Sequence, residues 1–249
     1  MSLLSTQETP GDLSDQSLPS MILPACLLGL LLAMDGICFG LHIARVMNPS
    51  IGTDLYLLEH DRGYGEFFQY IKTLWVVLLL TRLGLHRRDA GFVVWAMVYL
   101  YLLADDALGF HEHGGTWLTR SMELPEILGL RGQDLGELLV TATAGGVLLI
   151  AVMACYAFQC PSMRKVSRQM MTLTLGIAFF GVGVDMVHSM LRFIPGLYSK
   201  AGVIEDGGEM LMMSVVLWYV LVLTVRQGRP AASILGSLRQ SMGLIFRKA

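Results

Sequence analysis

The stretch GFVVWAMVYLYLLADDALGFHE, residues 91–112, is an apolar run that ends in acids and a histidine. About 20 consecutive apolar residues allow an α-helix to cross the ~30 Å hydrocarbon core of a bilayer. The run therefore predicts a membrane-spanning helix with Asp105, Asp106 and Glu112 toward one end. An ionised side chain that faces lipid costs at least ~2.5 kcal/mol. We therefore expect these acids to face the interior of a helix bundle.

Five further apolar runs of similar length occur in the chain. The six predicted spans cover residues 21–46, 64–85, 91–112, 135–159, 169–192 and 205–226. Hydrophobic residues make up 54% of the 249 residues and charged residues only 15%, against about 25% charged residues in soluble domains. The sequence therefore predicts an all-α fold, a polytopic integral membrane bundle of six transmembrane helices.

An even number of spans places both termini on one side of the membrane. Lys and Arg are more frequent on that side, which predicts that both termini are cytoplasmic. The predicted divisions are a disordered cytoplasmic tail over 1–20, a six-helix transmembrane domain over 21–226 and an amphipathic cytoplasmic tail over 227–249. We expect a multi-pass protein of the bacterial inner (plasma) membrane.

Two shorter helices are predicted beside the spans. Residues 116–124 suit a small helix at the outer interface, with Trp117 as its anchor. In the C-terminal tail, Ile234, Leu238 and Ile245 share one helical face, which is typical of a helix that lies on the anionic inner leaflet. Membrane lipids, and further membrane-protein subunits, are the expected partners. The net charge of −2 gives no indication of nucleic-acid binding.

Most of the 20 acidic residues fall on or near the outer side. Helical spacing predicts that Asp105 and Glu112 share one stripe of the third span, and that Asp106 and His113 lie on the neighbouring stripe. Gly114 and Gly115 would then terminate this helix.

The predicted acidic cluster needs a compensating positive charge. Lys72 is the only cation expected from within the spans. A converging set of carboxyls cannot stay fully ionised and dry, so some are protonated, water reaches them, or a bound cation neutralises them.

A metal site is the preferred interpretation of this cluster. Carboxylates with one or two imidazoles favour zinc, manganese or iron, and the D-x-x-H step of Asp185 and His188 echoes the E-x-x-H step of dimetal helix bundles. The predicted metal ligands are Asp105, His111, Glu112, His113, Asp185 and His188, with His111 or His113 completing the set. The predicted catalytic or supporting groups are Asp106, Glu137 and Glu209.

Two other interpretations are open. Intramembrane acids and histidines also form proton or ion pathways, although the polar groups stop halfway and Asp35 is the only deep acid that would extend them. Alternatively the cluster only fixes helix register, with Lys72 paired to an aspartate.

Three motifs carry a resemblance to known proteins. D-D-x-x-x-x-H-E at 105–112, DRGYGEFFQYIK at 61–72 and E-D-G-G-E at 205–209 resemble motifs of uncharacterised multi-pass bacterial membrane proteins. The layout is also distantly similar to the superfamily of alkaline ceramidases and progestin/adipoQ receptors, seven-helix proteins whose Asp and His residues hold zinc near one membrane face. This chain differs in having six predicted spans and no H-x-x-x-H near its C-terminus, so the analogy concerns architecture alone.

The function expected from these residues is that of a metal-dependent membrane enzyme, a hydrolase that acts on a lipid or another amphiphile entering from the outer leaflet. Glu209 or Asp106 would be the general base. A two-metal redox enzyme, a non-catalytic subunit of a larger membrane complex and a proton- or ion-coupled transporter are the alternatives.

Overall fold

The computed structural model describes residues 17–127 and 129–246, and over these residues the protein consists of helices and their connections, without a β-strand. Within that part of the chain, six helices are long and apolar enough to cross a membrane. Five of them are α2 (Ser17–Met47), α3 (Tyr64–Arg87), α4 (Ala90–Leu108), α6 (Gly132–Phe158) and α9 (Pro195–Val225). The remaining one, between α6 and α9, is a continuous segment that consists of α7 (Pro161–Ala178), η2 (Phe179–Val184), α8 (Asp185–Met190) and η3 (Leu191–Phe193). The shorter elements are η1 (Asp54–Tyr56), α5 (Phe110–Met122) and α10 (Ile234–Phe246). The predicted all-α fold with six long apolar helices is confirmed. The predicted N-terminal tail lies mostly outside the described residues.

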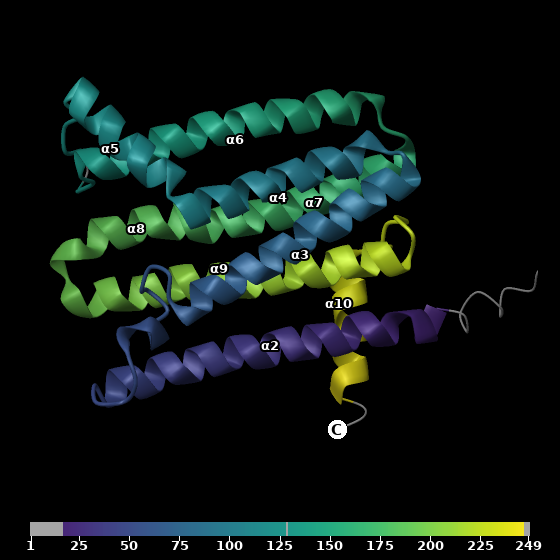
Figure 1. Ribbon diagram of the computed structural model, residues 1–249, viewed down its shortest axis with the longest axis horizontal. Coiled ribbons are helices and arrows are strands. Elements are labelled where there is room, and N and C mark those ends of the chain that lie inside the picture. Colours follow the sequence, from purple (N-terminus) through teal and green to yellow (C-terminus); the bar gives the residue numbers. More distant parts are fainter. Residues whose placement is uncertain (1–16, 128, 247–249) are drawn as a thin grey trace, which may run out of the picture.

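Successive long helices run in opposite directions, so the start of α2 and the end of α9 lie at the same end of the bundle (Figure 1). Short turns enforce these reversals. The α3 helix ends at Arg87, and its C-cap residue, Arg88, adopts a left-handed conformation. Asp89 then caps α4 by accepting a hydrogen bond from the Gly91 N–H at 2.8 Å. The end of the bundle that carries α5 is named the α5 end below.

The core lies between the central helices. Trp218 and Tyr219 of α9 are fully buried in one cluster with Trp95 and Tyr99 of α4. The α6 helix is different, because only 6% of its apolar window is buried, against 56% for α9. Apolar side chains such as Ile150 therefore face outward, which fits a multi-pass membrane protein.

A buried salt bridge joins α2, α3 and α9. The Lys72 Nζ donates to Asp35 Oδ1 at 3.0 Å, to the Met210 carbonyl at 2.6 Å and to Ser214 Oγ at 3.2 Å. Ser214 in turn donates to Asp35 Oδ2 at 2.6 Å. The side chains of Lys72 and Asp35 are 1% and 0% exposed. All three ammonium protons have acceptors, so this lysine is paired with Asp35 and does not neutralise the acids at the α5 end.

The third apolar helix is shorter than predicted. It ends at Leu108, because Gly109 adopts a left-handed conformation with φ of 63° and starts the new helix α5. The expectation of one helix over 91–112 was therefore wrong, as was the expectation that Gly114 and Gly115 end it. Both glycines lie inside α5. Asp105 and Glu112 consequently sit on different helices rather than on one stripe.

The last two apolar segments begin earlier than predicted. The fifth starts at Pro161, at the first position of a helix, where proline costs no hydrogen bond. It also contains a π-helical turn, η2, immediately before α8. The sixth starts at Pro195 rather than at residue 205.

The C-terminal helix α10 crosses behind α2 and is in contact with it (Figure 1). The predicted apolar face is present, and Ile234, Leu238 and Ile245 pack against the bundle core. A hydrogen bond of 3.2 Å from Trp218 Nε1 to Ser241 Oγ fastens the helix. This face is therefore covered by the bundle, and the opposite face carries exposed residues such as Leu235.

The Lys72 pair predicts a non-additive response to substitution. Lys72→Met leaves a buried carboxylate without its counter-charge and should cost about 3–5 kcal/mol of unfolding free energy. The double variant Asp35→Leu/Lys72→Met removes both charges and should recover most of that loss. Equilibrium unfolding in mixed micelles measures both values. A double variant as unstable as the single one would contradict this account.

Candidate functional site

Asp105 organises the junction between α4 and α5. Its Oδ1 accepts a hydrogen bond from the His111 backbone N–H at 2.9 Å, and its Oδ2 lies 3.0 Å from His111 Nδ1. A single buried carboxylate thus bonds the first turn of α5 and orients one imidazole. The bond to Asp105 raises the pKa of His111 to about 9, so the ring is charged at neutral pH and Nδ1 donates to the carboxylate.

Two glycines let α5 lie directly on the start of α6. A Cβ atom on Gly115 would stand 2.6 Å from the Glu137 backbone nitrogen, and one on Gly136 would stand 2.5 Å from the Gly115 carbonyl oxygen. Any larger residue would push the helices apart. This close crossing brings Glu112 of α5 and Glu137 of α6 to the wall of one cavity.

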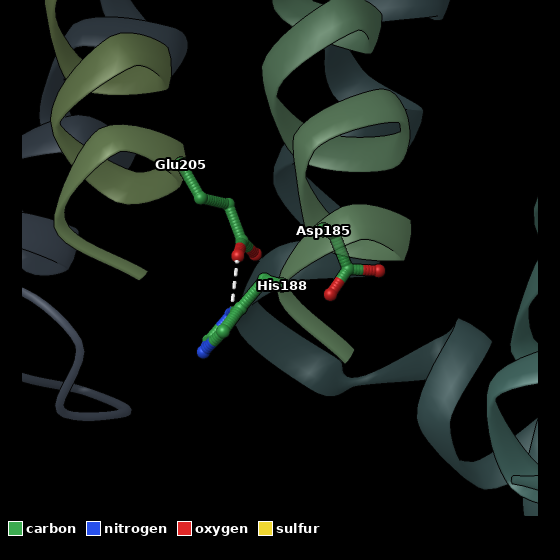
Figure 2. Close-up of side chains that lie close together, drawn as sticks. All are labelled: Asp185, His188 and Glu205. Carbon is green, nitrogen blue, oxygen red and sulfur yellow. Dashed lines mark hydrogen bonds and ion pairs between the residues drawn. The ribbon is translucent and has the colours of Figure 1, made fainter. Parts of the chain in front are cut away.

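Asp185, His188 and Glu205 form the most compact group of ligand-type side chains. Asp185 and His188 are one turn apart on α8, and Glu205 comes from α9. His188 Nδ1 lies 2.7 Å from Glu205 Oε2, as Figure 2 shows. One ligand atom from each residue lies within 4.8 Å of the other two. Among the described residues, no other three His, Cys, Asp or Glu side chains meet this criterion.

The chemistry of this trio fits a divalent metal. One imidazole and two carboxylates form a donor set suited to zinc, manganese or iron, and three protein ligands leave a tetrahedral ion one position for water. His188 Nε2 is buried and has no hydrogen-bonding partner in the described part of the chain. The ring also packs on Tyr198, with centroids 4.1 Å apart, which limits its rotation. The imidazole is therefore held in place by its Nδ1, while its Nε2 makes no hydrogen bond to the described residues.

The π-helical turn η2 precedes the trio and meets the side chain of Glu209. A Cβ atom on Gly181 would stand 1.6 Å from Glu209 Oε1, so only glycine permits this carboxylate position. On the other side, Gln69 Nε2 donates to Glu209 Oε2 at 3.1 Å. Such π-turns are frequent at functional sites, because they alter the direction in which following side chains point.

These side chains open onto a cavity of about 710 Å³, within the range of small-molecule sites. The carboxyl groups line its part at the α5 end. They belong to Asp61, Asp105, Asp106, Glu112, Glu137, Asp185, Glu205 and Glu209. The deeper part is mainly apolar and is lined by residues such as Trp95, Leu148, Val152, Met171 and Leu175. The cavity therefore has an acidic end and an apolar end.

A second, smaller cavity of about 130 Å³ adjoins the acidic end. Glu59, Glu66 and Asp206 line it, and six residues line both cavities: Asp61, Gln69, Asp106, His111, Glu112 and Glu209. These shared side chains form the partition between the two spaces.

The model of a family described as "Domain of unknown function (DUF8692)" matches residues 25–225. The chain belongs to the DUF8692 family. No curated protein and no solved structure matches it. The matched region contains the six long apolar helices, apart from the first residues of α2, and all the residues of the two cavities.

In this DUF8692 chain the predicted site residues separate into groups. Asp185 and His188 lie together, whereas Asp105 and His111 bond to each other, and Glu112 lines the cavity beside them. His113 is exposed, and its Nδ1 lies 2.6 Å from the Gly109 carbonyl oxygen, so it lines neither cavity. The predicted catalytic groups Asp106, Glu137 and Glu209 all line the larger cavity.

Glu205 is the residue of the trio that the sequence prediction did not include. It precedes Glu209 by four residues, so both carboxylates lie on one face of α9. The i, i+4 spacing of Glu205 and Glu209 could therefore have identified Glu205 as a candidate site residue from the sequence. Asp206, three residues before Glu209, lines only the smaller cavity.

The Asp105–His111 pair predicts a pH-dependent stability of the DUF8692 chain. Because the pKa of His111 is raised from 6.5 to about 9 in the folded state, the stabilisation is complete below about pH 6.5 and is lost as the pH rises through about 9. Thermal unfolding of wild type and His111→Gln over this range should show a difference that shrinks with rising pH. A difference that is constant or grows would contradict the assignment.

Gly181 predicts a contrast between two neighbouring glycines. Gly181→Ala places a methyl group on the Glu209 carboxylate, whereas Gly183→Ala meets only Phe179 at 3.8 Å, an ordinary contact. The free energy of unfolding of Gly181→Ala should be about 1–3 kcal/mol lower than that of Gly183→Ala, because only the methyl group at 181 clashes with a carboxylate. At 183 the methyl group has room, and alanine favours a helix more than glycine does. Equal stabilities would show that Glu209 moves aside freely.

Proposed function

We propose that this protein is a multi-pass inner-membrane protein with cytoplasmic termini and a metal-dependent hydrolase that acts on a lipid or other amphiphile. The orientation is supported by the basic residues at the end of the bundle opposite the α5 end. These include Arg87, Arg88, Arg164, Lys165, Arg168, Arg226 and Arg229. The α5 end would then face outward.

One observation carries the enzymatic proposal. The trio of Asp185, His188 and Glu205 stands at the acidic end of a cavity whose deeper wall is apolar, and two of its members line that cavity. An amphiphile with its chain on the apolar wall would present its polar group to the trio. The shape of the cavity would then align the polar group of the amphiphile with the trio.

In this proposal Asp185, His188 and Glu205 hold the metal. A metal ion bound there would lower the pKa of a water molecule and polarise a carbonyl or phosphoryl oxygen. Glu209 acts as the general base, because Gln69 donates to its carboxylate and Gly181 leaves room for it at the partition between the cavities. Asp106 and Glu137 line the same cavity and would support the metal ligands and the bound water.

The proposal predicts bound metal. Elemental analysis of the purified protein should find about one equivalent of zinc, manganese or iron per chain. Asp185→Ala and His188→Ala should each retain less than about a tenth of it, since a three-ligand site that loses one ligand binds metal poorly. His113→Ala is the matched control and should keep the wild-type content, because its ring bonds only to the Gly109 carbonyl.

Two results would overturn this proposal. Wild-type protein without stoichiometric metal would favour a non-catalytic subunit of a larger complex. Equal metal loss in His113→Ala would show that the substitutions act on folding.

Glu209→Gln should keep the metal, because Glu209 is outside the trio.

A further inference from the structure

The α6 helix forms one wall of the larger cavity without closing it. It packs extensively only against α5 and α4. In Figure 1 it runs along the outer edge of the bundle, separated from α7 and α8. Residues of α6, such as Gly145 and Leu148, face the same cavity as Met171 and Leu175 of α7. The side of the cavity between α6 and the α7–α8 segment is therefore not sealed by helix packing.

The larger cavity, with its acidic and apolar ends together, is long. On α6 the lining runs from Glu137 to Val152, about 22 Å at the helical rise, and on the opposite wall it runs from Asp185 to Met171, about 21 Å. The hydrocarbon part of one bilayer leaflet, which a lipid chain spans, is about 15 Å thick, half of the ~30 Å core. The cavity can therefore take a whole lipid chain along its length.

The acidic end gathers many carboxyl groups and few compensating cations. Among the described residues, no lysine or arginine lines either cavity. Lys72 is bound to Asp35 inside the bundle, and Arg131 pairs with Asp134 at 2.7 Å. A divalent metal on the trio would offset only two charges, and His111 one more. Additional positive charge on the occupant would stabilise this end, and an anionic headgroup would meet like charges.

We propose that the cavity binds a single-chain amphiphile with a cationic amine headgroup, which enters sideways from the bilayer between α6 and the α7–α8 segment. The amine lies among the carboxylates, and the chain extends along the apolar wall. This inference names the substrate class of the proposed hydrolase, and it rests on that function for what happens to the bound amphiphile. The binding of the amphiphile is measured separately from hydrolysis.

The test is equilibrium binding of tritiated hexadecylamine to the purified full-length protein in detergent, measured by scintillation proximity. We expect saturable binding that unlabelled hexadecylamine displaces. Hexadecanol should compete at least about tenfold less well, and hexadecanoate less well still, because charge-assisted bonds to carboxylates are lost or replaced by repulsion. Equal competition by the three compounds, or stronger competition by hexadecanoate, would overturn the proposal.

Two adjacent glycines of α6 provide a matched pair of variants for locating the chain. A Cβ on Gly145 or Gly146 meets nothing within 4 Å, but only Gly145 lines the cavity. Gly145→Leu should weaken amine binding at least about tenfold by filling the apolar channel, whereas Gly146→Leu should bind like wild type. If both bind like wild type, or both lose binding equally, the chain does not occupy this cavity.

Two measurements on the wild type separate this proposal from the metal proposal. Saturable amine binding by a wild type that proves to lack metal supports the cavity assignment and overturns the metal proposal alone. Stoichiometric metal in a wild type that shows no saturable amine binding would overturn this inference alone.

Discussion

The salt bridge between Lys72 and Asp35, completed by Ser214, determines how α2, α3 and α9 meet. A charge buried among apolar helices is stable only when its partner and its remaining hydrogen bonds are supplied nearby. Lys72 satisfies this requirement in the middle of the bundle and is therefore unavailable elsewhere. The carboxylates at the α5 end must be neutralised by histidines, protons, water or a bound cation.

Glycines set the geometry of that end. Gly109 ends α4 and turns the chain into α5, Gly115 and Gly136 let α5 rest on α6, and Gly181 makes room for the carboxylate of Glu209. Each acts through the missing side chain or through a backbone conformation that favours glycine. Together they bring acids from α4, α5, α6, α8 and α9 to a single cavity.

The two proposals use different parts of this cavity. The metal proposal depends on Asp185, His188 and Glu205, whose donor types suit a divalent ion and whose ligand atoms lie within 4.8 Å of one another. The amphiphile proposal depends on the apolar channel and on the absence of lysine and arginine from its lining. They meet at the acidic end, where Glu205 belongs to the trio and also lines the cavity. Because α6 packs extensively only against α4 and α5, the proposed route from the bilayer to the trio lies beside it.

The sequence by itself determined the helical class and the six long apolar segments, because hydrophobic length depends only on local composition. It also located the acidic end, since Asp105, Asp106, Glu137, Asp185 and Glu209 all line the cavity. Helical periodicity failed where a single left-handed residue, Gly109, divided the predicted span, since a regular spacing rule cannot anticipate a break in the helix. Only the tertiary structure decided the partner of Lys72, the pairing of Asp105 with His111, and the meeting of Glu205 with His188. Each of these contacts joins residues whose mutual orientation depends on how separate helices pack, which no local pattern encodes.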